Sequence, residues 1–330
     1  MTDAARPDDR PTVTDAELRE AITLASLTYL DENDDDPFIQ RMIIETFLGY
    51  DDLPTAGWQL AWGPASNNTN LWYIARSPGG DRFALVIRGT VMTDWRSKLD
   101  DIDIPLVAPL IEGAPDGARI AQGLATCQGR LNGARDVWEH VTAWEYLGGV
   151  LDAGHTLDVV GHSLGGALAP IVSLDAMARF PDVAVRSLAI AGMSPGNQAF
   201  SHWYVGSLRH QQASRFINRF DIIPEWYAGL STMQDGFPGG PSCPLKISAL
   251  IEAMKLYMDV ERIQYVATPS PREFPGVIYA DRSWTEEAEG QHEHLYYMYL
   301  AGVPLEVIHR RFPRYPQWQP PANQPSSDPS

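Results

Sequence analysis

The stretch "TLDVVGHSLGGALAP", residues 156–170, constrains the fold of this chain most strongly. It joins an apolar run typical of a buried strand to a run of small residues typical of a close-packed helix. Between them stands Ser163, with Gly161 two positions before it and Gly165 two positions after it. At a sharp strand-to-helix turn, side chains at these two positions would clash, and the serine hydroxyl would project outward. The pattern therefore favours Ser163 as a nucleophile over a serine in an ordinary glycine-rich turn.

Patterns typical of strands and helices alternate through the middle of the chain. Strand-like runs occur in "RFALVIRGT", "TLDVVG", "VRSLAIAG" and "SRFINRF", and helical runs such as "GARDVWEHVTAWEYLGG" lie between them. This alternation predicts an α/β fold with a central, mostly parallel sheet flanked by helices. Two helices are expected before the sheet, one starting at Asp15 and one over Phe38–Leu48. The long segment 231–290 is expected to be an insertion that shapes an acyl pocket or forms an extra cap.

The chain is long enough for one large domain. It has 330 residues, of which 44% are hydrophobic and 20% charged, as in ordinary globular proteins. The polar, proline-containing residues 1–13 and the proline-rich residues 313–330 are expected to be disordered ends. We therefore expect a single domain over residues 14–312.

The formal net charge of the chain is -17, which excludes some classes of partner. An acidic chain repels nucleic acid over long range, so no nucleic-acid partner is expected. No stretch approaches the roughly 20 apolar residues of a membrane span, and the N-terminus has no secretory signal pattern. We expect a cytoplasmic protein, with export by a signal-independent route left open.

The sequence predicts neither a metal site nor a disulfide framework. The acidic run "DENDDD" has no glycine at the turn that a calcium loop requires. Two cysteines, Cys127 and Cys243, are too few for a disulfide scaffold. Two buried free thiols are expected, and a single bridge between them is the alternative.

A nucleophilic serine needs a histidine base and a carboxylate that orients the base. In strand-then-helix hydrolases the chain order is serine, acid, histidine. Asp221 follows a strand-like run and precedes Pro224, which places it just past a strand end. Two histidines, His292 and His294, stand in "QHEHLYY" at an expected loop-to-helix junction. Either of them could serve as the base.

Five motifs occur in an order that resembles the class 3 lipases, the fungal-type triacylglycerol lipase family with an α/β-hydrolase fold. The resemblance covers roughly residues 80–305. Its motifs are "ALVIRGT" followed by "DW", "VVGHSLGGALA", "GMSPGNQAF", "INRFDIIP" and "HLYYMYLAG". One departure is "AQGLA", where the family usually has His-x-Gly-Phe.

The resemblance implies a role for each matching residue. Ser163 would be the nucleophile, Asp221 the acid and His294 the base. Backbone N–H groups of Thr90 and Leu164 would form the oxyanion hole. The choice of His294 and of the two oxyanion-hole residues follows the family motifs, whereas Ser163 and Asp221 are also indicated by the residues around them.

Two further assignments concern a lid and a second histidine. Trp95 looks like the family's lid tryptophan, in a stretch that is equally typical of a solvated surface helix. Some bacterial members instead have a Gln-His run with a tyrosine four residues later. "QHEHLY" satisfies that pattern too, with His292 as the alternative base and Tyr296 as the tyrosine.

The resemblance implies hydrolysis of acyl esters, such as triacylglycerol-like lipids, through an acyl-enzyme intermediate. The substrate would be met at a lipid–water interface, and no cofactor or metal would be required. A phospholipase A-type enzyme and a polysaccharide-ester (feruloyl-like) esterase are alternatives on the same fold. A non-catalytic lipid-binding protein is an alternative of another class.

Overall fold

A central sheet organises the chain. The structure is a computed structural model, and it describes residues 13–30, 36–67, 70–89, 104–313, 315 and 318–322. Within these residues the sheet has seven strands in the order β1-β2-β3-β6-β7-β8-β9. Pairing is antiparallel from β1 to β3 and parallel from β3 to β9. The strands are β1 (Gln59–Asn67), β2 (Asn70–Arg76), β3 (Arg82–Ile87), β6 (Thr156–His162), β7 (Ala184–Ile190), β8 (Ala213–Asn218) and β9 (Arg272–Phe274).

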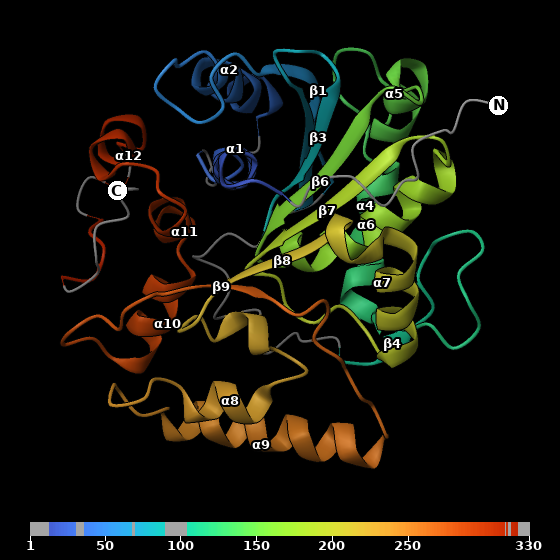
Figure 1. Cartoon of the computed structure of the whole chain (residues 1–330). Helices are drawn as coiled ribbons and strands as arrows, with labels where there is room; N and C mark the ends of the chain where they lie inside the picture. Colours follow the sequence, from blue (N-terminus) through green and yellow to red (C-terminus); the bar gives the residue numbers. More distant parts are fainter. Residues whose placement is uncertain are drawn as a thin grey trace.

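Helices cover both faces of this sheet (Figure 1). One face carries α1 (Asp15–Leu27), α2 (Pro37–Leu48), α11 (His294–Leu300) and α12 (Leu305–Arg311). The other face carries α4 (Gln122–Gly133), α5 (Ala143–Val150), α6 (Leu164–Arg179) and α7 (Gln198–Gln212). The mostly parallel sheet and the two N-terminal helices are thus as the sequence predicts.

Alternation along the strands divides the core into two layers. Leu85 and Val159 belong to the cluster under α4 and α6, whereas Val86 and Val160 belong to the cluster under α1 and α11. Successive side chains of a strand point to opposite faces, so a strand covered on both faces is apolar throughout. This explains the continuous apolar run before Ser163.

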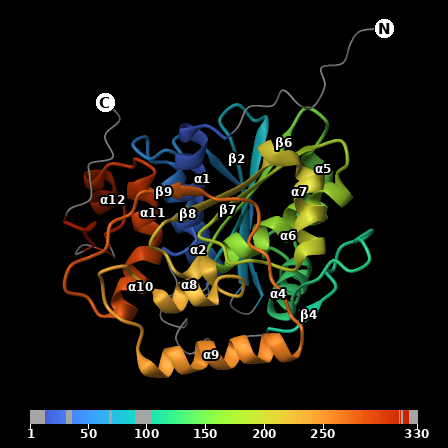
Figure 2. The same cartoon turned by 60° about the horizontal axis from the view of Figure 1, so that its bottom comes forward.

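Between β8 and α11 the chain lies at the carboxyl ends of the strands (Figure 1). It contains η3 (Ile223–Glu225), α8 (Leu230–Asp235), α9 (Leu245–Val260) and α10 (Trp284–His292). Figures 1 and 2 show α8 and α9 below the sheet, with α9 outermost. The segment 231–290 is not purely an insertion, because it also contributes β9, which pairs with β8 in the main sheet.

α1 begins at Asp15 as predicted, and its N-cap is Thr14, which forms a capping box with Glu17. The tail differs from the sequence prediction. In the proline-rich tail, Tyr315 packs against His294, and Trp318 packs against α11. The expected disorder of the tail is therefore wrong at these residues. Disorder of the outermost ends stays a prediction, because residues 1–12 and 323–330 lie outside the described part of the chain.

A partly buried ion network links α1 to the first residues of the central strands. Glu17 accepts hydrogen bonds from Arg186 at 2.7 Å and from Arg82 at 2.9 Å, and Arg186 also binds Asp158. Burial alone would raise the pKa of Glu17, but hydrogen bonds from Thr14 and Arg186 outweigh it and lower the pKa to about 2. The network holds α1 in a position from which Tyr29, two residues after the helix, contacts His162 at the carboxyl end of β6.

Candidate active site

Ser163 occupies a sharp turn between β6 and α6. Its backbone has φ 60° and ψ -123°, a conformation that costs energy for a residue with a side chain. Hydrogen bonds hold it on both sides, because its N–H donates to the carbonyl of Ile190 and its own carbonyl accepts from Ala167, both at 3.0 Å. This is the strand–turn–helix predicted from the sequence, with the serine at the apex.

The flanking glycines are required by close backbone contacts. A Cβ on Gly161 would lie 2.1 Å from the carbonyl oxygen of Gly165, and a Cβ on Gly165 would lie 2.2 Å from that of Ile87. A Cβ on Gly166 would lie 2.4 Å from the carbonyl oxygen of Ile190. No side chain fits at these positions, so the turn depends on all three glycines.

His292 connects Ser163 to Asp221. Its Nε2 lies 2.8 Å from Oγ of Ser163, and its Nδ1 lies 2.7 Å from Oδ2 of Asp221. All three side chains are buried, and Ser163 is the most accessible at 8%. The arrangement has the geometry of a serine nucleophile, a general base and an orienting acid.

The preference for His294 as the base is wrong in this structure. α10 ends at His292, Glu293 is extended with φ -60° and ψ 129°, and α11 begins at His294. This break turns the two histidines to different sides. The ring of His294 stacks on Tyr29 at 4.8 Å, and burial lowers its pKa to about 3. The Gln-His pattern identified the histidine at the serine, whereas the His-Leu-x-Tyr match pointed to its neighbour.

Asp221 is positioned by the turn that follows β8. Its N–H donates to the carbonyl of Asn218 at 2.9 Å, and its Oδ1 accepts from the N–H of Ile223 at 3.0 Å. Its Oδ2, which faces His292, also accepts the hydroxyl of Tyr297 at 2.7 Å. Burial, reinforced by the nearby Asp221, raises the pKa of Tyr297 well above its usual value, so this hydroxyl stays a donor.

Sequence reasoning did not single out Tyr297. The spacing that could have identified it is in the sequence, because Tyr297 lies one helical turn after His294 and five residues after His292. This spacing points to Asp221 only when α11 is known to face Asp221.

A buried polar network fixes the end of α10, where His292 stands. Asn218 donates to the backbone carbonyl of Gln291 at 3.0 Å, and Gln291 donates to Glu287 and to the carbonyl of Val277, both at 2.7 Å. Burial raises the pKa of Glu287. These bonds tie the carboxyl end of β8 to the residue before His292.

A second pair of buried rings lies behind the nucleophile. The hydroxyl of Tyr29 lies 2.9 Å from Nδ1 of His162, whose ring centroid is 4.9 Å from that of His292. Burial, followed by the neighbouring His292, lowers the pKa of His162 well below its usual value. A neutral His162 adds no charge beside the base.

Of the two expected oxyanion-hole residues, Leu164 lies in the described part of the chain. Leu164 is the first residue of α6, so its N–H has no partner within the helix and lies at the positive end of the helix dipole. Gly89 passes close to the nucleophile, since a Cβ there would lie 2.8 Å from Cβ of Ser163. Thr90 and Trp95 lie outside the described residues.

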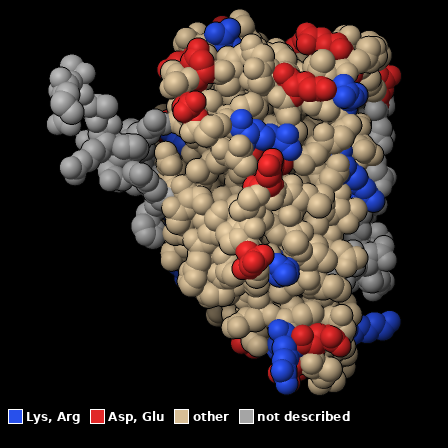
Figure 3. Space-filling view, turned by 90° about the vertical axis from the view of Figure 1, so that its right-hand side faces the viewer, with Lys and Arg blue, Asp and Glu red and all other residues tan. Residues whose placement is uncertain are grey.

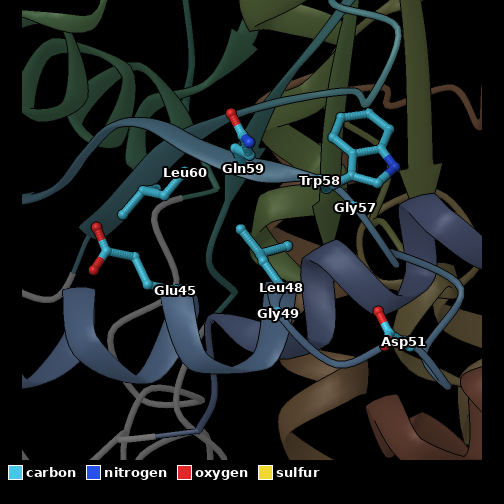
Figure 4. A pocket seen from close by; sticks show the side chains of 8 residues that line it. All are labelled: Glu45, Leu48, Gly49, Asp51, Gly57, Trp58, Gln59 and Leu60. Carbon is cyan, nitrogen blue, oxygen red and sulfur yellow. The ribbon is translucent and has the colours of Figure 1, made fainter.

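A hollow of about 470 Å³ lies between α2 and β1 (Figure 4). None of the triad residues lines it. Its lining consists of Glu45, Leu48, Gly49, Asp51, Gly57, Trp58, Gln59 and Leu60. It is therefore not part of the Ser163 site.

Other features bear on the expected partners. Among the described residues, no group of histidine, cysteine and acidic side chains could hold a metal ion, and no helix is long and apolar enough to cross a membrane. Cys127 and Cys243 form no disulfide, and both are only partly buried rather than buried as expected. Seen from the right-hand side of Figure 1, basic and acidic side chains lie in small mixed groups with uncharged surface between them (Figure 3).

Comparison with known proteins places this geometry in context. Residues 84–229 match the family model described as lipase (class 3). A secreted alkaline triacylglycerol lipase from Penicillium cyclopium is 28% identical over 159 residues, which cover 47% of this chain and 52% of the relative. The chain thus spans about half the length of that curated relative. The matched segments of the family model include Ser163 and Asp221 but end before His292.

Solved structures extend the similarity to nearly the whole chain. The crystal structure of M37 lipase superposes with a TM-score of 0.77 at 18% identity, over 92% of this chain and 100% of that one. A mutant form of MDLA from Penicillium cyclopium gives a TM-score of 0.51 at 18% identity, over 82% and 83% of the two chains. At this identity the likeness establishes the fold, which is the α/β-hydrolase fold expected from the sequence.

Proposed function

We propose that this chain, whose residues 84–229 match the class 3 lipase family model, hydrolyses acyl esters of triacylglycerol-like lipids. The observation that carries the proposal is the position of His292 between Ser163 and Asp221, at 2.8 and 2.7 Å. A structural serine has no need of a buried histidine–carboxylate pair at its hydroxyl. The Penicillium cyclopium relative, a triacylglycerol lipase, supports the choice of substrate class.

The proposed reaction begins with attack by Ser163. As its Oγ bonds to the ester carbonyl carbon, Nε2 of His292 takes the hydroxyl proton, and the carbonyl oxygen becomes an oxyanion. The N–H of Leu164, with Thr90 as the expected second donor, stabilises this charge, and each donor contributes about 3 kcal/mol in comparable sites. Collapse breaks the bond to the alcohol oxygen, which takes the proton from His292 and leaves an acyl group on Ser163.

Water completes the cycle by the same route. His292 takes a proton from water as the water oxygen bonds to the acyl carbon. Collapse of the second intermediate releases the fatty acid, and the proton returns from His292 to Ser163. The carboxylate of Asp221 orients the imidazole of His292 and stabilises its positive charge. None of these steps requires a metal or a cofactor.

Covalent labelling with a fluorophosphonate tests the catalytic proposal. We expect a single label on Ser163 and loss of both label and esterase activity in Ser163→Ala. Ser173→Ala is a matched control, because Ser173 is buried in α6 and its hydroxyl bonds to the carbonyl of Ala169. Full hydrolysis of nitrophenyl esters by Ser163→Ala would overturn the proposal.

The substrate class is tested separately with a panel of esters. Triacylglycerol emulsions, phosphatidylcholine and feruloyl esters should be compared at equal enzyme concentration. A preference for triacylglycerol is expected. A higher rate on phospholipid or on feruloyl esters would keep the triad and replace the proposed substrate.

The cellular location stays a prediction. We propose a cytoplasmic protein, as expected from the sequence, although the Penicillium cyclopium relative is a secreted lipase. Detection of the native protein in the culture medium, with no release of a cytoplasmic marker enzyme, would contradict this location.

A further inference from the structure

Helix α9 carries an unusual amount of exposed apolar surface. Leu245 is 89% exposed, Leu256 65% and Val260 67%, and Tyr257 is also exposed. Half of the large apolar side chains that are exposed among the described residues lie on this one helix. Single exposed apolar residues are ordinary, but a cluster of them marks a contact surface.

The exposed residues of α9 form one continuous stripe. Leu245, Ala249, Ala253, Leu256 and Val260 follow one another at steps of four, four, three and four residues, and all five are exposed. These steps place them on one side of a helix with 3.6 residues per turn. We call these five residues the outer stripe.

The opposite side of α9 makes the contacts that hold it to the protein. Ile251 and Met254 are buried in the main core cluster. Lys255 donates to the side chain of Gln234 on α8 at 2.7 Å. The helix therefore needs no contact on its outer stripe in order to stay in place.

α9 lies on the same edge of the sheet as the nucleophile. η3 begins two residues after Asp221, and α8 and α9 follow it along the chain. After α9, Val266 pairs with Gly196, which follows the carboxyl end of β7. Phe237, in the loop between α8 and α9, packs against Trp284 of α10, the helix that ends at His292. Figures 1 and 2 show α9 as the outermost element on this side.

The charge of α9 differs from that of the whole chain. The helix has two lysines, Lys246 and Lys255, and two acids, Glu252 and Asp259, so its net charge is zero. The chain as a whole carries -17. A strongly acidic protein is repelled by anionic surfaces, but a neutral apolar stripe is compatible with an uncharged or zwitterionic one.

The size of the outer stripe also limits what covers it. A helix of 16 residues is about 24 Å long and about 10 Å wide, so the stripe has an area of about 240 Å². A stable protein–protein interface needs about 800 Å² on each partner. The stripe is too small to support a dimer alone, whereas a lipid surface accepts a single amphipathic helix.

We infer that the outer stripe of α9 docks the protein on a neutral or zwitterionic lipid surface and brings the Ser163 edge of the sheet to that surface. This inference rests on the proposed function, because a water-insoluble ester must be reached where it aggregates. Tyr257, beside the stripe, has an apolar ring and a polar hydroxyl, as is typical of residues at a lipid–water boundary.

Vesicle binding tests the inference without depending on catalysis. The full chain with Ser163→Ala is mixed with phosphatidylcholine vesicles and sedimented. Leu256→Asp and, independently, Val260→Asp should each weaken binding about tenfold. Met42→Asp is a matched control, because Met42 is 59% exposed on α2, and it should bind like the parent.

Activity assays separate this inference from the proposed function. In the Ser163 parent, both α9 variants should hydrolyse a soluble short-chain ester at the unchanged rate and emulsified triacylglycerol about tenfold more slowly. Loss of vesicle binding in a protein that hydrolyses no ester would support the docking surface and reject the catalytic proposal. Equal vesicle binding by parent and variants would overturn the inference. So would a parent dimer in light scattering that Leu256→Asp converts to a monomer.

Discussion

His292 and His294 are two residues apart and have opposite surroundings. His292 lies between Ser163 and Asp221, whereas His294 stacks on Tyr29, with its pKa lowered to about 3 by burial. His292→Ala should therefore reduce kcat/KM on a soluble ester by at least about a thousandfold. His294→Asn should keep most of the activity of whatever protein folds. The measurement is kcat/KM per molecule of folded protein. An equal loss of kcat/KM in both variants would contradict the assignment of His292 as the base.

The hydroxyl of Tyr297 shares Oδ2 of Asp221 with His292, and both contacts are 2.7 Å long. Tyr297→Phe keeps the buried ring but removes both the donor to Asp221 and the acceptor of the Asn218 N–H at 2.9 Å, so the orientation of Asp221 toward His292 becomes looser. We expect kcat to fall about tenfold to a hundredfold, in line with the roughly 1.5–3 kcal/mol of one hydrogen bond to a charged group, with KM unchanged.

Tyr296→Phe is the matched control for Tyr297, because the Tyr296 hydroxyl instead accepts the N–H of Val277 at 2.9 Å. A role of Tyr297 in stability alone would lower the melting temperature and leave kcat per folded molecule unchanged. Steady-state kinetics and thermal unfolding of the same preparations distinguish the two outcomes.

At the scale of elements, α1 is held on the sheet by ions rather than by apolar contact alone. Glu17 has a pKa of about 2 in the folded protein and an ordinary value near 4.5. A depressed carboxyl pKa stabilises the fold at pH values above the unfolded pKa, and the effect is lost as the pH falls toward the folded pKa. The stabilisation by Glu17 should thus be complete at pH 7 and reduced by pH 3.

Glu17→Gln measures this contribution. We expect it to lower the free energy of unfolding by about 1–2 kcal/mol at pH 7, because solvent screens part of the interaction with Arg82 and Arg186. At pH 3 the difference between variant and parent should be smaller. Urea unfolding at both pH values gives the two differences. An equal difference at pH 3 and pH 7 would mean that the charge of Glu17 does not contribute.

For the whole molecule, sequence patterns predicted those parts of the fold that depend on interactions between residues close together in the sequence. The strand, turn and helix around Ser163 follow from apolar runs and from glycines without room for a Cβ. The position of Asp221 follows from a strand end. The choice between His292 and His294 could not be predicted, because it depends on the extended Glu293 between two helices.

Contacts between segments far apart in the sequence could not be predicted either. The pairing of Tyr29 with His162 depends on how α1 crosses the sheet. β9 has only three residues, too few for a recognisable strand pattern, and it forms because β8 offers an open edge. The outer stripe of α9 was visible as apolar letters, but only the fold shows which side of that helix the core covers.

The net charge of -17 opposes binding to an anionic membrane, whereas the neutral outer stripe favours binding to a lipid surface. The two effects can be distinguished by their dependence on salt concentration. The Debye length falls from about 30 Å at 0.01 M salt to about 8 Å at 0.15 M, so salt screens the repulsion between the protein and an anionic surface. Binding to vesicles that contain anionic lipid should therefore strengthen as salt rises over this range. Binding to phosphatidylcholine should change little, since apolar contact is not screened. Co-sedimentation at the two salt concentrations provides the measurement. Tighter binding to anionic vesicles at low salt would instead show that Lys246 and Lys255 outweigh the charge of the whole chain.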